Sequence, residues 1–145
     1  MIQLQRLNPQ IIDEDGFARS GIRSYHEYIV LAKLPQVDGV SDRVLQALQK
    51  RVGHAPMAIE HIAQDLNLSK RTLQRRLQQQ GASFAQLRDS LRFHHAIKFL
   101  IDDHMSVDAV STALDFSDRT SFTNAFKRWT NLSPSVFRKL FRDYA

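Results

Sequence analysis

The hydrophobic positions after residue 40 recur at helical spacing, and one set of them occurs twice. The first set has the i, i+3, i+4, i+7 spacing of a helix that buries one stripe, and consists of Ile59, Ile62, Ala63 and Leu66. The second set lies 48 residues further along and consists of Val107, Val110, Ser111 and Leu114. Each set leads through a short polar break into another amphipathic stretch, which contains Leu73 and Leu77 in the first copy and Phe122 and Phe126 in the second. The pattern therefore predicts two copies of a helix, a tight turn and a second helix.

A long helix is expected between the two copies. Ser83 and Gln86 form an S-x-x-Q capping pattern, and the helix that they open continues to about Ile101. At about 1.5 Å per residue, such a helix spans roughly 27 Å. It is long enough to hold the two copies apart as separate units.

Further helices are expected at both ends of the chain. One begins at Ser41 as N-cap, and the last begins at Ser133 as N-cap with Pro134 in its first position. Before them, residues 22–34 are predicted to form a helix that a proline stops, whereas residues 1–21 favour an irregular tail. The sequence therefore predicts an all-α fold of about seven helices plus an N-terminal helix, with two helix-turn-helix units joined by a long bridging helix.

Composition narrows the class of protein. The 145 residues are 43% hydrophobic and 24% charged, which is enough apolar material for a folded core. No apolar run approaches the roughly 18 residues that cross a bilayer, and the N-terminus lacks the layout of a signal peptide. A cytoplasmic protein with no membrane partner is therefore expected. The absence of cysteine excludes disulfides, thiol nucleophiles and cysteine-based metal sites.

Positive charge is concentrated after residue 40. Residues 1–40 have a net charge of −1, whereas residues 41–145 have 16 basic and 10 acidic residues and a net charge of +6. The whole chain carries +5, with a pI near 9.9, and residues 70–76 hold four cations and no anion. The two parts are interpreted as a tail, helix and linker at 1–40 and a paired helix-turn-helix domain at 41–145. A polyanion is the expected partner.

A helix-turn-helix unit places its second helix in the major groove of double-stranded DNA. Side chains on the outer face of each second helix are therefore candidates for reading bases: Arg71, Gln74 and Arg75 in the first unit, and Arg119, Thr120, Thr123 and Asn124 in the second. Residues at the start and on the flanks of these helices are candidates for binding phosphates: Ser69, Lys70, Arg76, Ser117, Lys127 and Arg128. Arginine can bind guanine and glutamine can bind adenine through two hydrogen bonds each, whereas free cations neutralise phosphates. The more basic first unit is expected to supply more of the affinity.

The second unit and the residues after it resemble a known family. The run A-F-K-R-W-T-N-L-S-P at residues 125–134, followed by F-R at 137–138, is close to the signature of the AraC/XylS family of bacterial transcription regulators. The resemblance covers the DNA-binding domain of that family, from about Ser41 to Phe141. It implies seven helices, two groove-reading helices bridged by the long one, and promoter binding that brings RNA polymerase to a start site, as an activator does. The family often has arginine at the position of Asn124, so no strong guanine contact is expected there.

The resemblance also implies a missing part. Family members usually place a sensor and dimerisation domain of well over a hundred residues before this module, and 40 residues cannot form one. Residues 22–34 are interpreted as the last helix of such a domain, followed by its linker. A truncated regulator without a small-molecule effector pocket is therefore expected.

The histidines and polar loops are not arranged for catalysis or metal binding. His94 and His95 are adjacent and are expected to point apart on their helix, and no H-E-x-x-H motif is present. No nucleophile motif and no phosphate-cradling glycine loop occur either. No enzymatic activity, metal or cofactor is therefore expected, and Phe122, Phe126 and Trp129 are expected to pack against the last helix. Two alternatives stay open: a helical module that docks on a protein such as RNA polymerase without reading DNA, and a small helical hydrolase.

Overall fold

Helices make up the regular structure of residues 21–144, the part of the chain that the computed structural model describes. The eight α-helices of that range are α3 (Tyr25–Leu31), α4 (Gly39–Arg51), α5 (Ile59–Asp65), α6 (Lys70–Gln79), α7 (Phe84–Ile97), α8 (Val107–Ala113), α9 (Arg119–Thr130) and α10 (Pro134–Phe141). A π-helical turn (Lys98–Asp102) extends α7, and a 3-10 turn (Arg142–Tyr144) follows α10. The predicted all-α fold of seven helices plus an N-terminal one is confirmed. The predicted tail lies outside the described residues, apart from Gly21.

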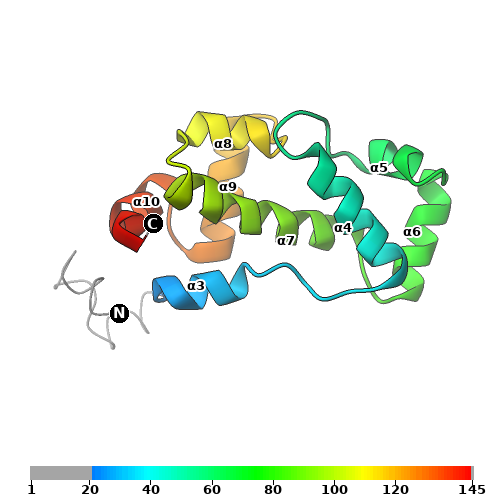
Figure 1. Ribbon diagram of the computed structural model, residues 1–145, viewed down its shortest axis with the longest axis horizontal. Coiled ribbons are helices and arrows are strands. Elements are labelled where there is room, and N and C mark those ends of the chain that lie inside the picture. Colours follow the sequence, from blue (N-terminus) through cyan, green and yellow to red (C-terminus); the bar gives the residue numbers. More distant parts are fainter. Residues whose placement is uncertain (1–20, 145) are drawn as a thin grey trace.

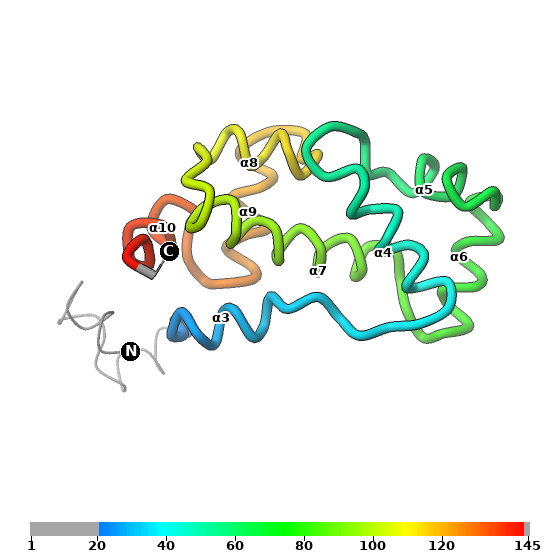
Figure 2. Tube along the Cα trace, in the orientation of Figure 1, coloured from blue at the N-terminus to red at the C-terminus, as the bar shows by residue number. Residues whose placement is uncertain are grey.

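The helices form two groups at the two ends of α7. Figure 1 shows α4, α5 and α6 around one end of α7, and α8, α9 and α10 around the other. The tube in Figure 2 follows the chain from the first group through α7 into the second. The predicted arrangement of two helix-turn-helix units and one bridging helix is therefore confirmed. No helix in the described range is long and apolar enough to cross a membrane.

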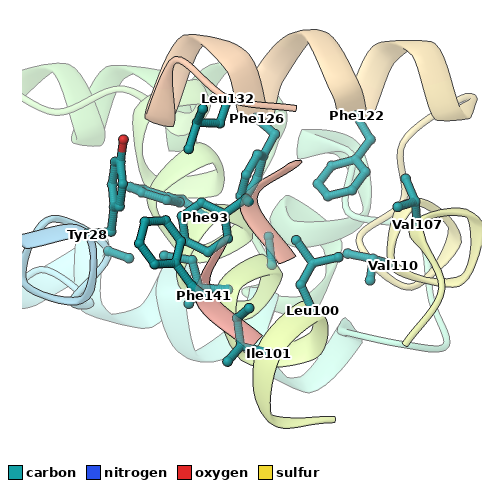
Figure 3. Packing of buried hydrophobic residues seen from close by; sticks show 14 of the residues in the cluster. Tyr28, Phe93, Leu100, Ile101, Val107, Val110, Phe122, Phe126, Leu132 and Phe141 are labelled. Carbon is teal, nitrogen blue, oxygen red and sulfur yellow. The ribbon is translucent and has the colours of Figure 1, made fainter. Parts of the chain in front are cut away.

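Each group has its own hydrophobic core, and α7 belongs to both. The N-terminal core includes Val44, Leu48, Met57, Ile62, Leu73, Leu77, Leu87 and Leu91. The C-terminal core includes Tyr28, Phe93, Ile97, Leu100, Val110, Leu114, Phe122, Phe126, Phe137 and Phe141, and Figure 3 shows part of its packing. The repeated hydrophobic stripes of the two units thus face two different cores. On α7 the change from one core to the other falls between Leu91 and Phe93.

Side-chain caps begin most of these helices. In each of them an oxygen of the N-cap side chain accepts a hydrogen bond from the backbone N–H three residues further on. The capping residues are Ser24, Ser69, Ser83, Ser106, Asp118 and Ser133. Each such bond satisfies an N–H that the first helical turn leaves unpaired and is worth about 1 kcal/mol. The predicted caps at Ser69, Ser83 and Ser133 are confirmed.

The prediction that Ser41 caps its helix is wrong. α4 begins at Gly39 with Asp38 in the N-cap position, so Ser41 lies inside the first turn. Its buried hydroxyl donates to Oε1 of Gln80 at 2.7 Å, and its backbone N–H donates to the same oxygen at 3.0 Å. The chain enters the helix through Gly39, whose φ of 59° suits glycine. The serine therefore bonds to the residue that ends α6 and does not cap its own helix.

Two other helix ends differ from the prediction. α3 is shorter than residues 22–34, because Ser24 forms a capping box with Glu27 and Ala32 ends the helix. α7 is α-helical only to Ile97, and the predicted remainder is the π-helical turn. Leu100 and Ile101 in that turn are fully buried, so the wider turn still belongs to the core.

α3 packs against the C-terminal group. The Tyr28 hydroxyl donates to the Thr130 carbonyl at 2.6 Å and accepts from the Arg23 N–H at 3.0 Å. Its ring contacts Phe137 and Phe141 edge-on, at centroid distances of 5.3 and 5.8 Å. A mainly apolar groove of about 380 Å³ runs between α3 and the last turns of α7. The expectation that no effector binds stays a prediction.

The aromatic residues of α9 pack as a core, with one difference from the prediction. Phe126 contacts Phe137 of the last helix at 5.1 Å, as expected. Trp129 instead stacks on Phe93 of α7 at 5.3 Å, and Phe122 contacts Phe126 at 5.8 Å. α9 is therefore held between the bridging helix and the last helix.

Candidate nucleic-acid interface

α6 presents a polar and basic face to solvent. Leu73 and Leu77 are buried, and this fixes the rotation of the helix about its axis. The three residues predicted to read bases, Arg71, Gln74 and Arg75, are exposed. The two arginines lie opposite the leucines, and the glutamine lies at the side of the helix. α6 contains four basic residues and no acidic one. The arrangement can offer bidentate donors to a polyanion that carries base edges.

α9 presents a less basic face by the same construction. Phe122, Ala125 and Phe126 are buried. The four residues predicted to read bases lie in the first two turns of α9. Arg119, Thr120 and Asn124 are exposed, and Thr123 is half-buried. The structure thus brings both predicted sets together on their helices, and their roles stay predictions.

An ion pair occurs at the same place in both units. Lys70 Nζ lies 3.2 Å from Glu60 Oε1, and Arg119 Nη1 lies 3.6 Å from Asp108 Oδ1. Each pair joins the first residue of the second helix to the second residue of the first helix. The pKa of Glu60 is below its usual range, because its own backbone N–H and the Lys70 ammonium donate to the carboxylate. The sequence analysis missed both pairs, although aligning the two copies would have placed an acid opposite a cation in each.

The remaining phosphate candidates fall into two classes. Arg128 lies 3.9 Å from Asp89 of α7, so part of its charge is offset within the protein. Arg76 and Lys127 are exposed and form no ion pair among the described residues. Among the phosphate candidates, these two cations are therefore the ones whose charge no ion pair offsets.

The two second helices begin differently. α6 begins with the neutral cap Ser69, whose Oγ accepts from the Thr72 N–H at 3.1 Å. α9 begins with the carboxylate of Asp118, whose pKa is lowered because it accepts from the Ser121 N–H. Ser117, the predicted phosphate ligand, therefore lies just before the cap, and its hydroxyl contacts that of Ser121 at 3.1 Å. The extra residue in the second turn introduces an anion at the start of α9.

The prediction that His94 and His95 point apart is wrong. Their rings meet edge to face at a centroid distance of 5.1 Å. His94 Nδ1 lies 3.0 Å from the Ala32 carbonyl, and His95 Nε2 lies 3.0 Å from Gln49 Oε1. Rotation about the side-chain bonds brings the two rings together even though their Cβ atoms diverge. Within the described range no group of three or more potential ligands is placed to hold a metal ion.

Comparison with known proteins matches this architecture. A family model described as "Helix-turn-helix domain" matches residues 62–140. The chain is 38% identical over 79 residues to the HTH-type transcriptional regulator VqsM of Pseudomonas aeruginosa, a match that covers 54% of this chain and 24% of that protein. It is 32% identical over 110 residues to the ornithine utilization regulator of the same species, covering 76% of this chain and 32% of that protein.

A solved structure agrees with the fold. The crystal structure of the transcriptional regulator CdpR from Pseudomonas aeruginosa superposes with a TM-score of 0.62 at 30% identity, covering 70% of this chain and 32% of that one. The chain thus spans about a quarter to a third of the length of these relatives. The family model runs from Ile62 in α5 to Leu140 in α10, and so covers most of the first helix-turn-helix unit and all of the second.

Proposed function

The chain belongs to the AraC/XylS family of helix-turn-helix proteins, and from that premise we propose that it binds double-stranded promoter DNA sequence-specifically and regulates transcription. Members of this family are DNA-binding regulators and not enzymes. One observation carries the proposal: two second helices, α6 and α9, present exposed polar and basic faces from the two ends of one bridging helix. Two linked reading helices suit a duplex with two successive major-groove segments.

Each helix has a distinct part in this proposal. Arg71, Gln74 and Arg75 of α6 read bases in one groove segment, where arginine suits guanine and glutamine suits adenine. α9 reads the next segment through Arg119, Thr120, Thr123 and Asn124. The phosphate ligands are Ser69, Lys70, Arg76, Ser117, Lys127 and Arg128, and the unpaired Arg76 and Lys127 contribute most among them.

The proposal requires a long DNA site. Successive major-groove segments on one face of DNA are about 34 Å apart, so a monomer covers two segments and bends the duplex if its helices are closer than that. Binding requires no small-molecule effector in this proposal, because packing within the described residues already holds both helices. The likeness to the family supports activation through contact with RNA polymerase as the outcome of binding.

The test is selection of bound fragments from a random duplex pool, followed by two substitutions. Arg71→Ala should relax the base preference at one position, at a cost of about 1–3 kcal/mol on the selected site. Lys127→Ala should weaken selected and scrambled duplexes by the same factor, because phosphates carry no sequence information. A pool that yields no motif would contradict the proposal and favour the protein-docking alternative. Equal behaviour of the two variants would contradict the assigned roles.

A further inference from the structure

Hydrogen bonds tie the two helix-turn-helix units together beside α7. The backbone N–H of Gly53, in the loop after α4, donates to the Ala113 carbonyl at the end of α8 at 2.8 Å. The backbone N–H of Met57 donates to Oδ2 of Asp115, in the turn between α8 and α9, also at 2.8 Å. Figure 2 shows this loop and this turn approaching each other across the top of the molecule. The turn of the second unit is thus anchored on the backbone of the first.

Arg92 of α7 holds the same turn from below. Its Nε donates to the Leu114 carbonyl and its Nη2 to the Asp115 carbonyl, both at 2.8 Å. Its guanidinium lies 4.1 Å from the centre of the Phe116 ring, and the residue is 6% exposed. Burial lowers the pKa of this arginine to about 10, so it remains a cation at neutral pH. Burying a charge is costly, so we expect that a buried arginine whose hydrogen bonds go to two carbonyl groups serves a structural purpose.

The position of Arg92 suggests what that purpose is. The residue lies on α7 between Leu91, which packs in the N-terminal core, and Phe93, which packs in the C-terminal core. α7 supplies buried residues to both cores, and the partly buried Val52 at the end of α4 packs against both as well. Bending of α7 at this point would therefore change the placement of α6 relative to α9. The hydrogen bonds of Arg92 join α7 to the turn of the second unit at this junction and so restrict that bending.

The sequence repeat provides an internal comparison for Asp115. Its counterpart in the first unit is Asn67, which has nearly the same left-handed backbone, with a φ of 57° against 59°. Asparagine satisfies such a turn as well as aspartate does. The Asn67 side chain makes no hydrogen bond within the described residues, whereas the Asp115 carboxylate reaches the other unit. The need for a left-handed residue in the turn therefore does not explain why position 115 has a carboxylate that accepts a hydrogen bond from the first unit.

We propose that Asp115 and Arg92 form an inter-unit clamp that fixes the relative placement of α6 and α9, and so determines which spacing of half-sites the protein accepts on DNA. Both are positioning residues, because neither lies on a predicted reading face. The part of this inference that concerns spacing rests on the proposed function, and the part that concerns the placement of the helices does not. The two parts are tested separately.

The first test measures the distance between the units without DNA. Because the chain has no cysteine, Gln79→Cys in α6 and Ala109→Cys in α8 give two exposed, unique sites for spin labels. Double electron–electron resonance should show one narrow distance distribution for the otherwise native protein. Asp115→Gly, which keeps the left-handed turn but removes the carboxylate, should broaden or shift it. Asn67→Gly, the same change in the equivalent turn, should leave it unchanged.

Two further variants keep this test decisive. Asp115→Asn retains an acceptor for the Met57 N–H and should restore the narrow distribution. If Asp115→Gly fails to fold, as judged by circular dichroism, Arg92→Lys takes its place, because lysine keeps the charge but cannot bind two carbonyls in the same fork. A distribution unchanged in Asp115→Gly, or in Arg92→Lys where that variant is needed, would overturn the clamp.

The second test uses the DNA motif obtained by selection. Duplexes with the two half-sites one or two base pairs closer or further apart should bind the native protein more weakly, on the order of tenfold at the poorest spacing. Asp115→Gly should flatten this profile while binding to a single half-site stays the same, and Asn67→Gly should keep the native profile. A native profile in Asp115→Gly would overturn the spacing role. If the native protein does not bind DNA at all, that result would contradict the proposed function. The spin-label distances would still test the clamp.

Discussion

Glu60 provides a sharp test of how charge is used at the interface. Its carboxylate holds the Lys70 ammonium at 3.2 Å, and both side chains are about half exposed. Because its pKa is lowered, Glu60 is ionised at neutral pH. In the proposed complex its carboxylate would therefore compete with phosphates for Lys70 and would also repel them. Glu60→Gln removes the charge while keeping the size and an acceptor oxygen. We therefore expect this substitution to strengthen binding to DNA.

The expected gain is modest because the pair is exposed and screened. Exposed ion pairs are weak, and the release of one cation beside a polyanion should raise affinity on the order of twofold to fivefold near 0.1 M salt. The plot of log affinity against log salt should become steeper by up to about 0.9, which corresponds to one further cation that displaces counterions. The gain should shrink at higher salt, since the screening length falls from about 10 Å at 0.1 M to about 3 Å at 1 M.

Fluorescence anisotropy titrations at four or more salt concentrations measure both quantities. The gain should be the same on the selected motif and on a scrambled duplex, because phosphates carry no sequence. Glu27→Gln is the matched control: Glu27 also pairs with a cation, Arg23 at 3.7 Å, but lies on α3, and the substitution changes the net charge equally. Weaker binding by Glu60→Gln, or an equal gain in the control, would refute the reasoning. A gain confined to one sequence would instead place Glu60 against a base.

Two predictions concern stability. Tyr28→Phe should lower the free energy of unfolding by about 1–3 kcal/mol, because it leaves the buried Thr130 carbonyl and the Arg23 N–H without their partner. Urea unfolding measures this change, and an unchanged midpoint would contradict the docking of α3. Burial, with His94 and Lys98 nearby, lowers the pKa of His95 to about 4 from an ordinary 6.5, so between these values the unfolded chain binds the extra proton and the protein loses stability as pH falls. Because the ring is half exposed and solvent screens it, the free energy of unfolding should fall by only about 1–2 kcal/mol from pH 7 to pH 4. His95→Gln should flatten this part of the pH profile, and an unchanged profile would mean that another group causes the loss of stability.

Most of the fold could be predicted from the spacing of the hydrophobic residues and from the capping residues. The two stripes that start at Ile59 and Val107 faced their cores as the spacing required, and Ser69 and Ser133 capped their helices. These features are local, since each depends on residues within a turn or two. Ser41 was misassigned because its partner, Gln80, is 39 residues away and no local rule identifies it.

The candidate interface was predictable only in part, for the same reason. Rotation of α6 and α9 follows from their buried leucines and phenylalanines, so the exposed faces could be read from the sequence. Whether a cation on those faces is free depends on the neighbouring helix, and the pairs of Lys70 and Arg119 show that two of the predicted residues are not. The contact between Met57 and Asp115 joins residues 58 apart and depends on the packing of both units.

The differences between the two copies argue for unequal roles on DNA. Both copies have two helices, a left-handed residue at the same place in the turn and an ion pair at the same place, so the framework does not distinguish them. Their second helices differ in charge: α6 has four basic residues behind a neutral cap, whereas α9 has three basic residues behind the anionic cap Asp118. An anion at a helix start offsets the positive end of the helix dipole that would otherwise attract phosphate. Unit one should therefore supply the larger share of the salt-dependent affinity, and unit two should act chiefly through its threonine and asparagine side chains once the clamp has placed α9 in the next groove segment.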